Sequence, residues 1–299
     1  MQSFLDYIAI ERRYSPRTVQ AYEENLTAFR DYLRMHYGDP TLSPRQATEG
    51  DVKDWMMYII EEKQYSPRSV RQKLTTLHSY FRFLLRTGAV EKDVTRRVVA
   101  PKVDKPLPVF FKPGEMQRAT AYDDEADDFT SIRDCLIIQM LYQTGMRRAE
   151  MLGLTDADID LAGARIRIFG KRRKERFVPI GDKLISQIRK YQAFRPDNSS
   201  CGTFFVLQNR KGEVHPMNRT HLYNIVRARM GEVSTLKKHS PHVLRHTFAT
   251  AMLDNGADIR TIKDLLGHAS IAATQIYTHT TFEQVRRSYE AAHPRAKHN

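Results

Sequence analysis

Cysteine is scarce in this sequence, and long apolar runs are missing from it. Only Cys135 and Cys201 occur among 299 residues, and neither stands in a spacing typical of metal ligands. No stretch approaches the ~20 apolar residues that a membrane-spanning helix requires. Charges are scattered through Met1 to Arg13, which argues against a signal peptide. We therefore expect a soluble, cytoplasmic protein with no disulfide framework and no membrane partner.

Acidic residues are in the minority. The chain has 48 Lys/Arg against 35 Asp/Glu, a formal net charge of +13. Residues 1–105 carry 18 Lys/Arg and 14 Asp/Glu, and the remainder carries 30 and 21, so both halves are basic. Such a surface favours a polyanionic partner, of which nucleic acid is the commonest. The length suits two domains, and a hydrophobic share of 41% is too high for a disordered chain.

A short motif occurs twice near the start of the chain. Tyr14-Ser15-Pro16-Arg17 recurs 51 residues later as Tyr65-Ser66-Pro67-Arg68. Serine suits a helix N-cap and proline the first helical position, and apolar residues follow each copy at steps of three and four. We expect helices after both copies and shorter ones at 2–11 and 51–62. Free N–H groups at a helix start attract phosphate, so Arg17 and Arg68 are candidate DNA contacts. The alternative is that Ser-Pro is only a good helix start.

The fold class expected from these patterns is mainly α. A helical N-terminal domain would span 1–99, a Pro-rich linker 100–114, and a second domain 115–299. The second domain should be mostly helical with one small antiparallel sheet, a hairpin of strands 165–169 and 176–180. Helices are expected at 132–143, which Gly145 should end, and at 182–193, 218–231, 241–254, 258–266 and 282–291. Thr281 and Gln284 stand in capping-box positions for the last helix.

The turn of the predicted hairpin is strongly basic. Arg165 to Phe177 contains seven Lys/Arg and one acid. A charge run usually forms a solvated face, but a β-ribbon with a cationic tip also fits a DNA groove. Arg172, Arg173 and Lys174 are therefore further candidate DNA contacts.

Histidine and arginine share a face of the helix expected at 241–254. His242 and Arg245 are three residues apart, and His246 lies four from His242. Two histidines at this spacing can bind zinc, but metalloproteases place Glu directly after the first, and Val243 stands there. We expect no metal site.

Four segments together resemble the active-site boxes of the tyrosine recombinase family, and the Xer-type recombinases most closely. The likeness covers nearly the whole chain, with the boxes in family order and spacing. They are Thr144 to Glu150, the turn Gly170 to Glu175, His242 to His246, and Leu265 to His268 leading to Thr274 through His279.

The resemblance implies a role for six residues. Tyr277 would be the nucleophile that forms a 3′-phosphotyrosyl bond with DNA. Arg147, Lys171, His242, Arg245 and His268 would complete the catalytic set. Arg148 directly follows Arg147, where the family usually has a smaller or apolar residue, so Arg148 is an alternative for the first arginine. Gly145 and Glu150 favour the register on Arg147.

The chemistry explains these residue types. Attack on a phosphodiester builds negative charge on its oxygens, which two permanently charged guanidiniums can hold. A tyrosine phenol, with a reference pKa of ~10, needs a base such as His242. Lys171 is suited to protonate the departing 5′-oxygen, and His268 to bind the phosphate or orient Tyr277. The phosphotyrosyl bond conserves the energy of the cleaved linkage. We therefore expect no cofactor, and the sequence shows no Walker-type loop or paired-carboxylate motif.

The resemblance also implies partners. Both domains would clamp double-stranded DNA, and four protomers would assemble on it, with 282–299 as the contact element between them. Phe282, Val285 and Tyr289 form its apolar stripe, which could equally pack onto its own domain. An Xer-type role in chromosome or plasmid dimer resolution would add a second recombinase and a DNA translocase. The alternatives are a mobile-element integrase or DNA invertase, a type IB topoisomerase, and a non-catalytic DNA-binding relative.

Overall fold

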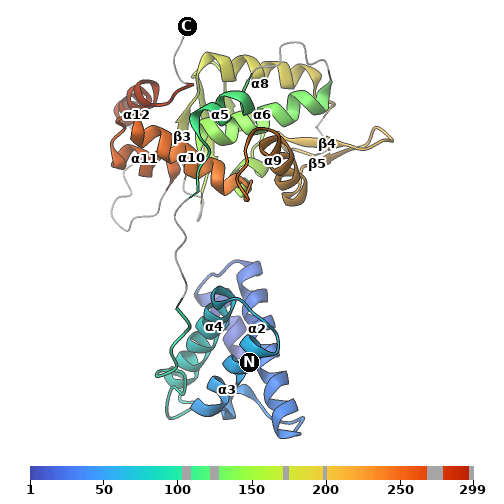
Figure 1. Ribbon diagram of the computed structural model, residues 1–299, viewed down its shortest axis with the longest axis vertical. Helices are drawn as coiled ribbons and strands as arrows, with labels where there is room; N and C mark the ends of the chain where they lie inside the picture. Colours follow the sequence, from blue (N-terminus) through green and yellow to red (C-terminus); the bar gives the residue numbers. More distant parts are fainter. Residues whose placement is uncertain (103–108, 122–127, 171–174, 198–200, 268–278, 296–299) are drawn as a thin grey trace. The chain divides into compact units, whose positions relative to one another are not determined.

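The computed structural model describes residues 1–102, 109–121, 128–170, 175–197, 201–267 and 279–295. The chain forms two compact units, Met1–Pro106 and Leu107–Asn299 (Figure 1). The division falls inside the Pro-rich segment 100–114. The described residues are mainly helical with small antiparallel sheets, which confirms the predicted fold class.

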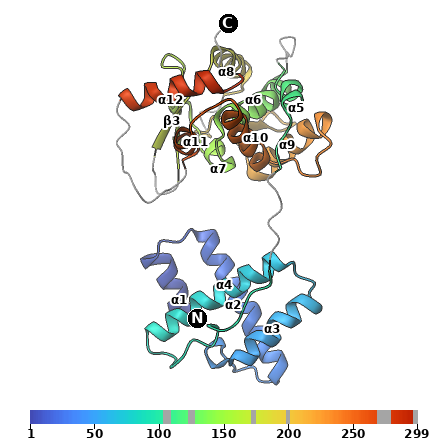
Figure 2. The same cartoon turned by 60° about the vertical axis from the view of Figure 1, so that its left-hand side comes forward.

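The N-terminal unit is all helical. Its elements are α1 (Gln2–Asp6), a π-helical turn (Tyr7–Glu11), α2 (Pro16–Tyr37), a 3-10 turn (Pro44–Gln46), α3 (Glu49–Glu61) and α4 (Pro67–Arg86). Helices α2, α3 and α4 contact one another pairwise (Figure 2). Their apolar stripes meet in a core that includes Phe29, Trp55, Leu77 and Phe81, each at most 1% exposed.

Both copies of the repeated motif start helices as predicted. The side chain of Ser15 accepts a hydrogen bond from the main-chain N–H of Thr18, and that of Ser66 from the N–H of Ser69, each at 3.3 Å. Proline occupies the first turn of both helices. Each serine therefore satisfies an N–H group that the helix itself leaves without a partner.

The repeat extends into the backbone before each serine. Arg13 and Gln64, also 51 residues apart, have φ of 50° and 53°, in the left-handed region. Midway along the helices, Asn25 donates its amide to the hydroxyl of Thr76, again 51 residues away, at 3.0 Å. The N-terminal unit thus contains two similar helix–turn–helix connections, with equivalent helices packed on each other.

The C-terminal unit combines helices with two sheets. Its helices are α5 (Pro113–Ala119), α6 (Phe129–Thr144), α7 (Arg148–Leu152), a 3-10 turn (Asp156–Asp158), α8 (Asp182–Phe194), α9 (Arg219–Val233), α10 (Pro241–Asp254), α11 (Ile259–Leu266) and α12 (His279–Ala292). One sheet has the order β1 (Ile159–Asp160), β2 (Arg165–Phe169), β3 (Glu175–Pro179). A second pairs β4 (Val206–Gln208) with β5 (Val214–Pro216).

Some predicted boundaries are wrong. The prediction of one small sheet misses β4 and β5, because strands of three residues are too short to show a period of two. The last helix begins at His279, not after a cap at Thr281. Strand β3 begins at Glu175 and ends at Pro179, one residue earlier than predicted at each end.

Helix α6 lies at the centre of the C-terminal unit. It contacts α8, α9 and α10, and residues 135–146 are all buried. The segment before α5 is also packed here, because Phe111 is 1% exposed and its N–H donates to the hydroxyl of Thr247 on α10 at 3.0 Å. In Figures 1 and 2, α10, α11 and α12 lie side by side; α10 packs on α6, and α11 and α12 pack on β3.

Helix α12 packs onto its own unit. Val285 and Tyr289 are 7% and 1% exposed and belong to the core of the C-terminal unit. The ring of His293 stacks on Tyr289 with centroids 5.1 Å apart. Of the two arrangements that the sequence left open, Val285 and Tyr289 have the intramolecular one in the single chain.

Candidate active site

The end of α6 positions the first arginine. Gly145 ends α6 with φ of 58°, and a Cβ there would lie 2.5 Å from Cδ1 of Phe248 and 2.8 Å from Cδ2 of Leu266. Only glycine suits both this backbone and this space. The sharp turn leads directly to Arg147, which is the N-cap of α7.

Glu150 holds Arg147 at two points. One carboxylate oxygen accepts from the main-chain N–H of Arg147 at 2.8 Å, and the other from its Nη1 at 2.7 Å. Burial would raise the pKa of Glu150, but hydrogen bonds and charge from Arg176, together with those of Arg147, hold it below its ordinary value. The carboxylate is therefore ionised, while the Arg147 side chain remains 39% exposed.

Arg245 lies on α10, where Pro241 forms the first turn. Its Nη1 donates to the carbonyl of Gly145 and its Nη2 to that of Leu266, both at 2.6 Å. The residue is 8% exposed. Burial and then the charge of Arg147 lower its pKa to about 10, so it stays protonated at neutral pH.

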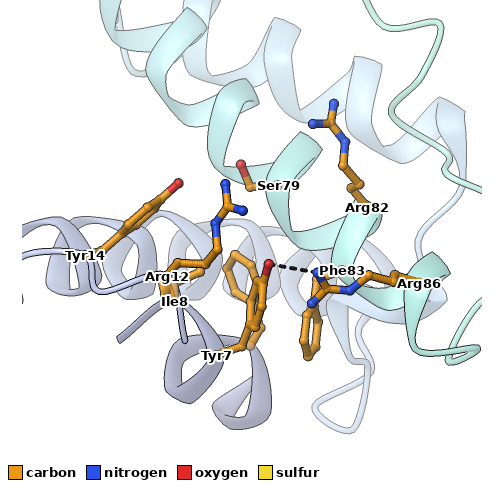
Figure 3. Close-up of a pocket in the computed structure, with 9 residues that line it drawn as sticks. Tyr7, Ile8, Arg12, Tyr14, Ser79, Arg82, Phe83 and Arg86 are labelled. Atoms are coloured by element: carbon orange, nitrogen blue, oxygen red, sulfur yellow. Dashed lines mark hydrogen bonds between the residues drawn. The ribbon is translucent and has the colours of Figure 1, made fainter. Parts of the chain in front are cut away.

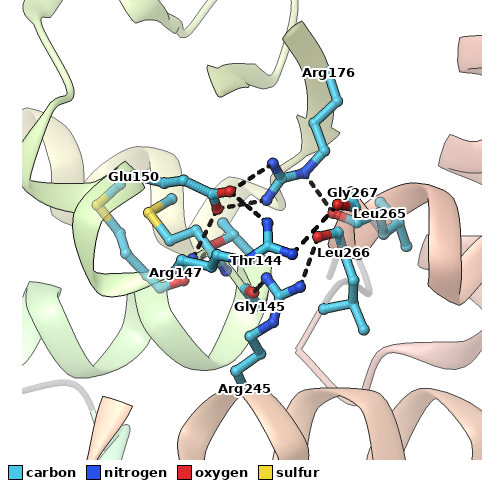
Figure 4. A network of polar contacts seen from close by, with 11 residues as sticks. Thr144, Gly145, Arg147, Glu150, Arg176, Arg245, Leu265, Leu266 and Gly267 are labelled. Atoms are coloured by element: carbon cyan, nitrogen blue, oxygen red, sulfur yellow. Dashed lines mark hydrogen bonds and ion pairs between the residues drawn. The ribbon is translucent and has the colours of Figure 1, made fainter. Parts of the chain in front are cut away.

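The carboxyl end of α11 joins these arginines to a third one (Figure 4). Gly267 accepts from Nη2 of Arg147 at 3.3 Å, and Leu265 accepts from Nε of Arg176 at 2.6 Å. Arg176 also donates both Nη atoms to Glu150. The network that Figure 4 draws thus contains three guanidiniums and one carboxylate, which pairs with Arg147 and Arg176. The surplus of positive charge makes the site a binding place for an anion.

His242 precedes Arg245 by one helical turn on α10 and is exposed. Partial loss of hydration, followed by the charges of Arg148 and Arg245, lowers the pKa of His242 below its ordinary 6.5. The imidazole is therefore mostly neutral at neutral pH and can accept a proton. Arg148, the alternative first arginine, makes no hydrogen bond to the described carbonyls of α11, in contrast to Arg147.

Several predicted site residues lie outside the described residues. They are Lys171, Arg172, Arg173, Lys174, His268 and Tyr277. The described residues adjoining them in sequence belong to the site: Gly267, which accepts from Arg147, precedes His268. Arg176, which binds Glu150, lies two residues after Lys174.

Two negative findings concern only the part of the chain that the structure describes. There, no three His, Cys, Asp or Glu side chains are grouped to hold a metal ion. No helix among the same residues is long and apolar enough to cross a membrane.

Comparison with known proteins identifies the family. Residues 110–284 match the model of the phage integrase family, and residues 1–88 match the phage integrase N-terminal SAM-like domain. The chain belongs to the phage integrase family, that of the tyrosine recombinases. The family and the enzyme class predicted from the sequence, a site-specific recombinase, are thereby confirmed.

Curated relatives span the full length of this recombinase. The chain is 37% identical to tyrosine recombinase XerC of Oceanobacillus iheyensis, with 100% of this chain and 97% of the relative covered. It is 35% identical to tyrosine recombinase XerC of Pelobacter propionicus, with 99% and 96% covered.

Solved structures share the fold at lower identity. XerH site-specific recombinase bound to difH substrate has a TM-score of 0.67 at 22% identity, with 95% of this chain and 83% of that chain covered. The Tn1549 transposon integrase in complex with transposon right end DNA has a TM-score of 0.69 at 17% identity, with 96% and 98% covered.

The N-terminal unit of the recombinase has a basic pocket that the sequence did not reveal. It encloses about 210 Å³ and is lined by Tyr7, Arg12, Tyr14, Arg82 and Arg86, among others (Figure 3). No acidic side chain lines it. The guanidinium of Arg86 lies 4.3 Å from the ring centroid of Tyr7 and donates to its hydroxyl at 2.9 Å. Arg82 and Arg86 lie one helical turn apart on α4, whereas Arg12 comes from a distant segment, so only the fold brings Arg12 to the other two. We call this group the pocket arginines: Arg12, Arg82 and Arg86.

Arg17 and Arg68 do not line this pocket, but both are exposed in the first turns of α2 and α4. Arg17 follows Tyr14, a pocket residue, by three positions, so the pocket adjoins the start of α2.

Proposed function

We propose that Tyr277 attacks a phosphodiester of duplex DNA, forms a 3′-phosphotyrosyl bond and displaces the 5′-oxygen as a hydroxyl. A 5′-hydroxyl from another strand then attacks this bond, re-forms the phosphodiester and releases the tyrosine. No ATP is consumed, because the phosphotyrosyl bond conserves the energy of the cleaved linkage.

The observation that carries this proposal is that Arg147 and Arg245 are both held at the carboxyl end of α11. Each donates to a carbonyl at the end of α11, at Gly267 and Leu266, although the two arginines come from distant parts of the chain. Their positive charge would stabilise the negative charge that builds up on the non-bridging oxygens when a phosphate is attacked.

Proton transfer requires a base and an acid. His242 is suited to take the phenolic proton of Tyr277, since its lowered pKa keeps it neutral. We assign Lys171 to the protonation of the 5′-oxygen and His268 to a hydrogen bond with the phosphate. The arginines supply the positive charge for which other nucleases use metal ions, so the proposal includes no cofactor.

DNA binding would involve both units. Arg17, Arg68 and the pocket arginines would contact the phosphate backbone from the N-terminal unit. Arg172, Arg173 and Lys174 would do so from the C-terminal unit. Such contacts release counterions, so the affinity should fall steeply with salt.

The biological role that we propose is Xer-type resolution of chromosome or plasmid dimers in the cytoplasm. The full-length match to relatives named XerC supports this role over integration, inversion or DNA relaxation. Strand exchange between two duplexes calls for four protomers, including copies of a second recombinase, and for regulation by a DNA translocase. Exchange of residues 282–299 between protomers would replace the intramolecular contacts of Val285 and Tyr289 with equivalent ones in a neighbour.

The test is formation of a covalent adduct. A duplex selected for binding from a randomised pool is nicked near the cleavage position, so that the cleaved end diffuses away and the adduct accumulates. Wild type should give a denaturant-stable protein–DNA adduct, and Tyr277→Phe should give none. Tyr223→Phe, which removes an exposed hydroxyl on α9, is the matched control and should react like wild type.

Two results would contradict the proposal. The first is a persistent adduct in Tyr277→Phe, which would place the nucleophile elsewhere. The second is a wild-type protein that binds the duplex and forms no adduct, even with a second recombinase present.

A further inference from the structure

Arg176 is a charged residue inside the core of the C-terminal unit. It lies on β3, where the alternation of the strand puts it on the same face as Val178, and it is 4% exposed. Burying a guanidinium is costly unless hydrogen bonds and an opposite charge compensate for it. The hydrogen-bond partners of Arg176 therefore indicate which parts of the structure it stabilises.

Those partners are Glu150 and the end of α11. Nη1 and Nη2 donate to the two oxygens of Glu150 at 3.1 and 2.8 Å, while Nε donates to the carbonyl of Leu265 at 2.6 Å. A planar guanidinium bound on two sides in this way has one permitted orientation. Arg176 thus fixes α7 and α11 relative to β3.

Each partner of Arg176 leads to Arg147. Glu150 accepts from both the main chain and the side chain of Arg147. At the end of α11, the successive carbonyls of Leu265, Leu266 and Gly267 accept from Arg176, Arg245 and Arg147 respectively. Arg176 fixes the position of α11, and this position determines where the carbonyls that bind Arg147 and Arg245 lie.

Arg176 differs from Arg147 in access to a ligand. The side chain of Arg147 is 39% exposed and that of Arg176 is 5% exposed. Gly267 closes over the guanidinium of Arg176, since a Cβ there would lie 3.0 Å from its Nη1. The guanidinium of Arg147 is accessible to a DNA phosphate, whereas Gly267, Glu150 and Leu265 enclose that of Arg176.

We propose that Arg176 is a positioning residue for DNA cleavage, which acts through Glu150 and the end of α11 to orient Arg147. It does not contact the phosphate. This inference rests on the proposed function, in which Arg147 and Arg245 hold the phosphate under attack.

Lysine cannot replace arginine in this role. An ammonium group keeps the charge opposite Glu150 but is a single point, so it cannot bind both carboxylate oxygens and the carbonyl of Leu265. Arg176→Lys should therefore fold and bind DNA, yet cleave more slowly than wild type.

The experiment compares Arg176→Gln and Arg176→Lys with wild type on the nicked duplex. Adduct formation is followed in single-turnover mode at saturating DNA, and the dissociation constant for DNA is measured separately. We expect Arg176→Gln to cleave about 100-fold more slowly, as small misplacements of catalytic groups do, with affinity unchanged within about twofold. Arg165→Gln removes an arginine of the same hairpin from its half-buried pair with Asp160, away from Glu150 and α11, and should match wild type.

A double-variant cycle separates positioning from general destabilisation. If Arg176 acts through Arg147, Arg147→Gln combined with Arg176→Gln should cleave at nearly the rate of Arg147→Gln alone. Circular dichroism melting checks folding. If Arg176→Gln does not fold, Arg176→Lys takes its place in every measurement.

Three results would overturn the role of Arg176. They are cleavage within threefold of wild type, equal losses in rate and affinity, and rate losses that multiply in the double variant. A wild-type protein that forms no adduct would be recognised separately, as failure of the function on which this role rests.

Discussion

Two groups of arginines in this recombinase are held in opposite ways. The pocket arginines of the N-terminal unit are exposed, and Arg86 is supported by the ring of Tyr7. In the C-terminal unit, Arg245 is buried and bound to main-chain carbonyls. Arg86 packs on one aromatic ring and donates to its hydroxyl, whereas Arg245 donates to two main-chain carbonyls in fixed directions.

The difference separates affinity from chemistry. Contacts with the DNA backbone need a positive charge close to a phosphate. An exposed guanidinium without a fixed orientation is sufficient, because neighbouring phosphates are equivalent. Stabilising a phosphate under attack requires donors that are already oriented, since reorientation during the reaction would add to the barrier. If this distinction is correct, variants in the two groups should affect different measurements.

The largest effect is expected from Arg245→Gln. A neutral amide can bond to one carbonyl but supplies no charge to the phosphate, so the single-turnover rate of adduct formation should fall about 1000-fold. Affinity for DNA should change little, because Arg245 is buried and would meet one phosphate only. Equal losses in rate and affinity would remove the distinction between the two groups.

An intermediate effect is expected from the double variant Arg12→Gln/Arg82→Gln. Loss of two phosphate contacts should lower affinity roughly 10- to 30-fold at physiological salt and reduce the slope of log K against log salt by ~0.9 per contact. The adduct rate at saturating DNA should not change. Arg30→Gln, from an arginine of the same unit that is paired with Asp31, is the control. An unchanged salt slope would exclude the pocket from the DNA interface.

The smallest effect concerns pH. His242 accepts a proton only when neutral, so its lowered pKa should move the acid loss of cleavage to lower pH than an ordinary imidazole would show. Removing a neighbouring positive charge with Arg148→Gln should raise the pKa of His242 and move this acid limb to higher pH. Rates across a pH series at saturating DNA measure the shift, and an unmoved limb would argue against His242 as the base.

Much of the N-terminal unit was predictable, because its signals are local. Ser15 and Ser66, each followed by proline, predicted the starts of α2 and α4 from a few adjacent residues. The left-handed conformations of Arg13 and Gln64 were not predictable, because neither residue type favours positive φ. The surrounding packing imposes that conformation.

The active site was predictable only through its resemblance to a family. Arg147, His242 and Arg245 were assigned by motif, and the structure adds how they are held. Arg176 was missed because it was counted with the exposed charges of the basic hairpin. The alternation of β3 contained the signal, since Arg176 shares its face with the buried Val178. Its bonds to Glu150 and Leu265 depend on tertiary contacts that no local pattern encodes.

The end of α11 places a limit on how this enzyme can change during evolution. Three successive carbonyls there bind three arginines from β3, α7 and the α10 helix. Insertion or deletion of one residue within α11 would rotate its end by about 100° and turn all three carbonyls away together. Substitutions on the outer face of α11 leave that register intact. Homologous sequences should therefore vary at the exposed positions Ile259, Arg260 and Lys263 while their length between α10 and Gly267 stays constant.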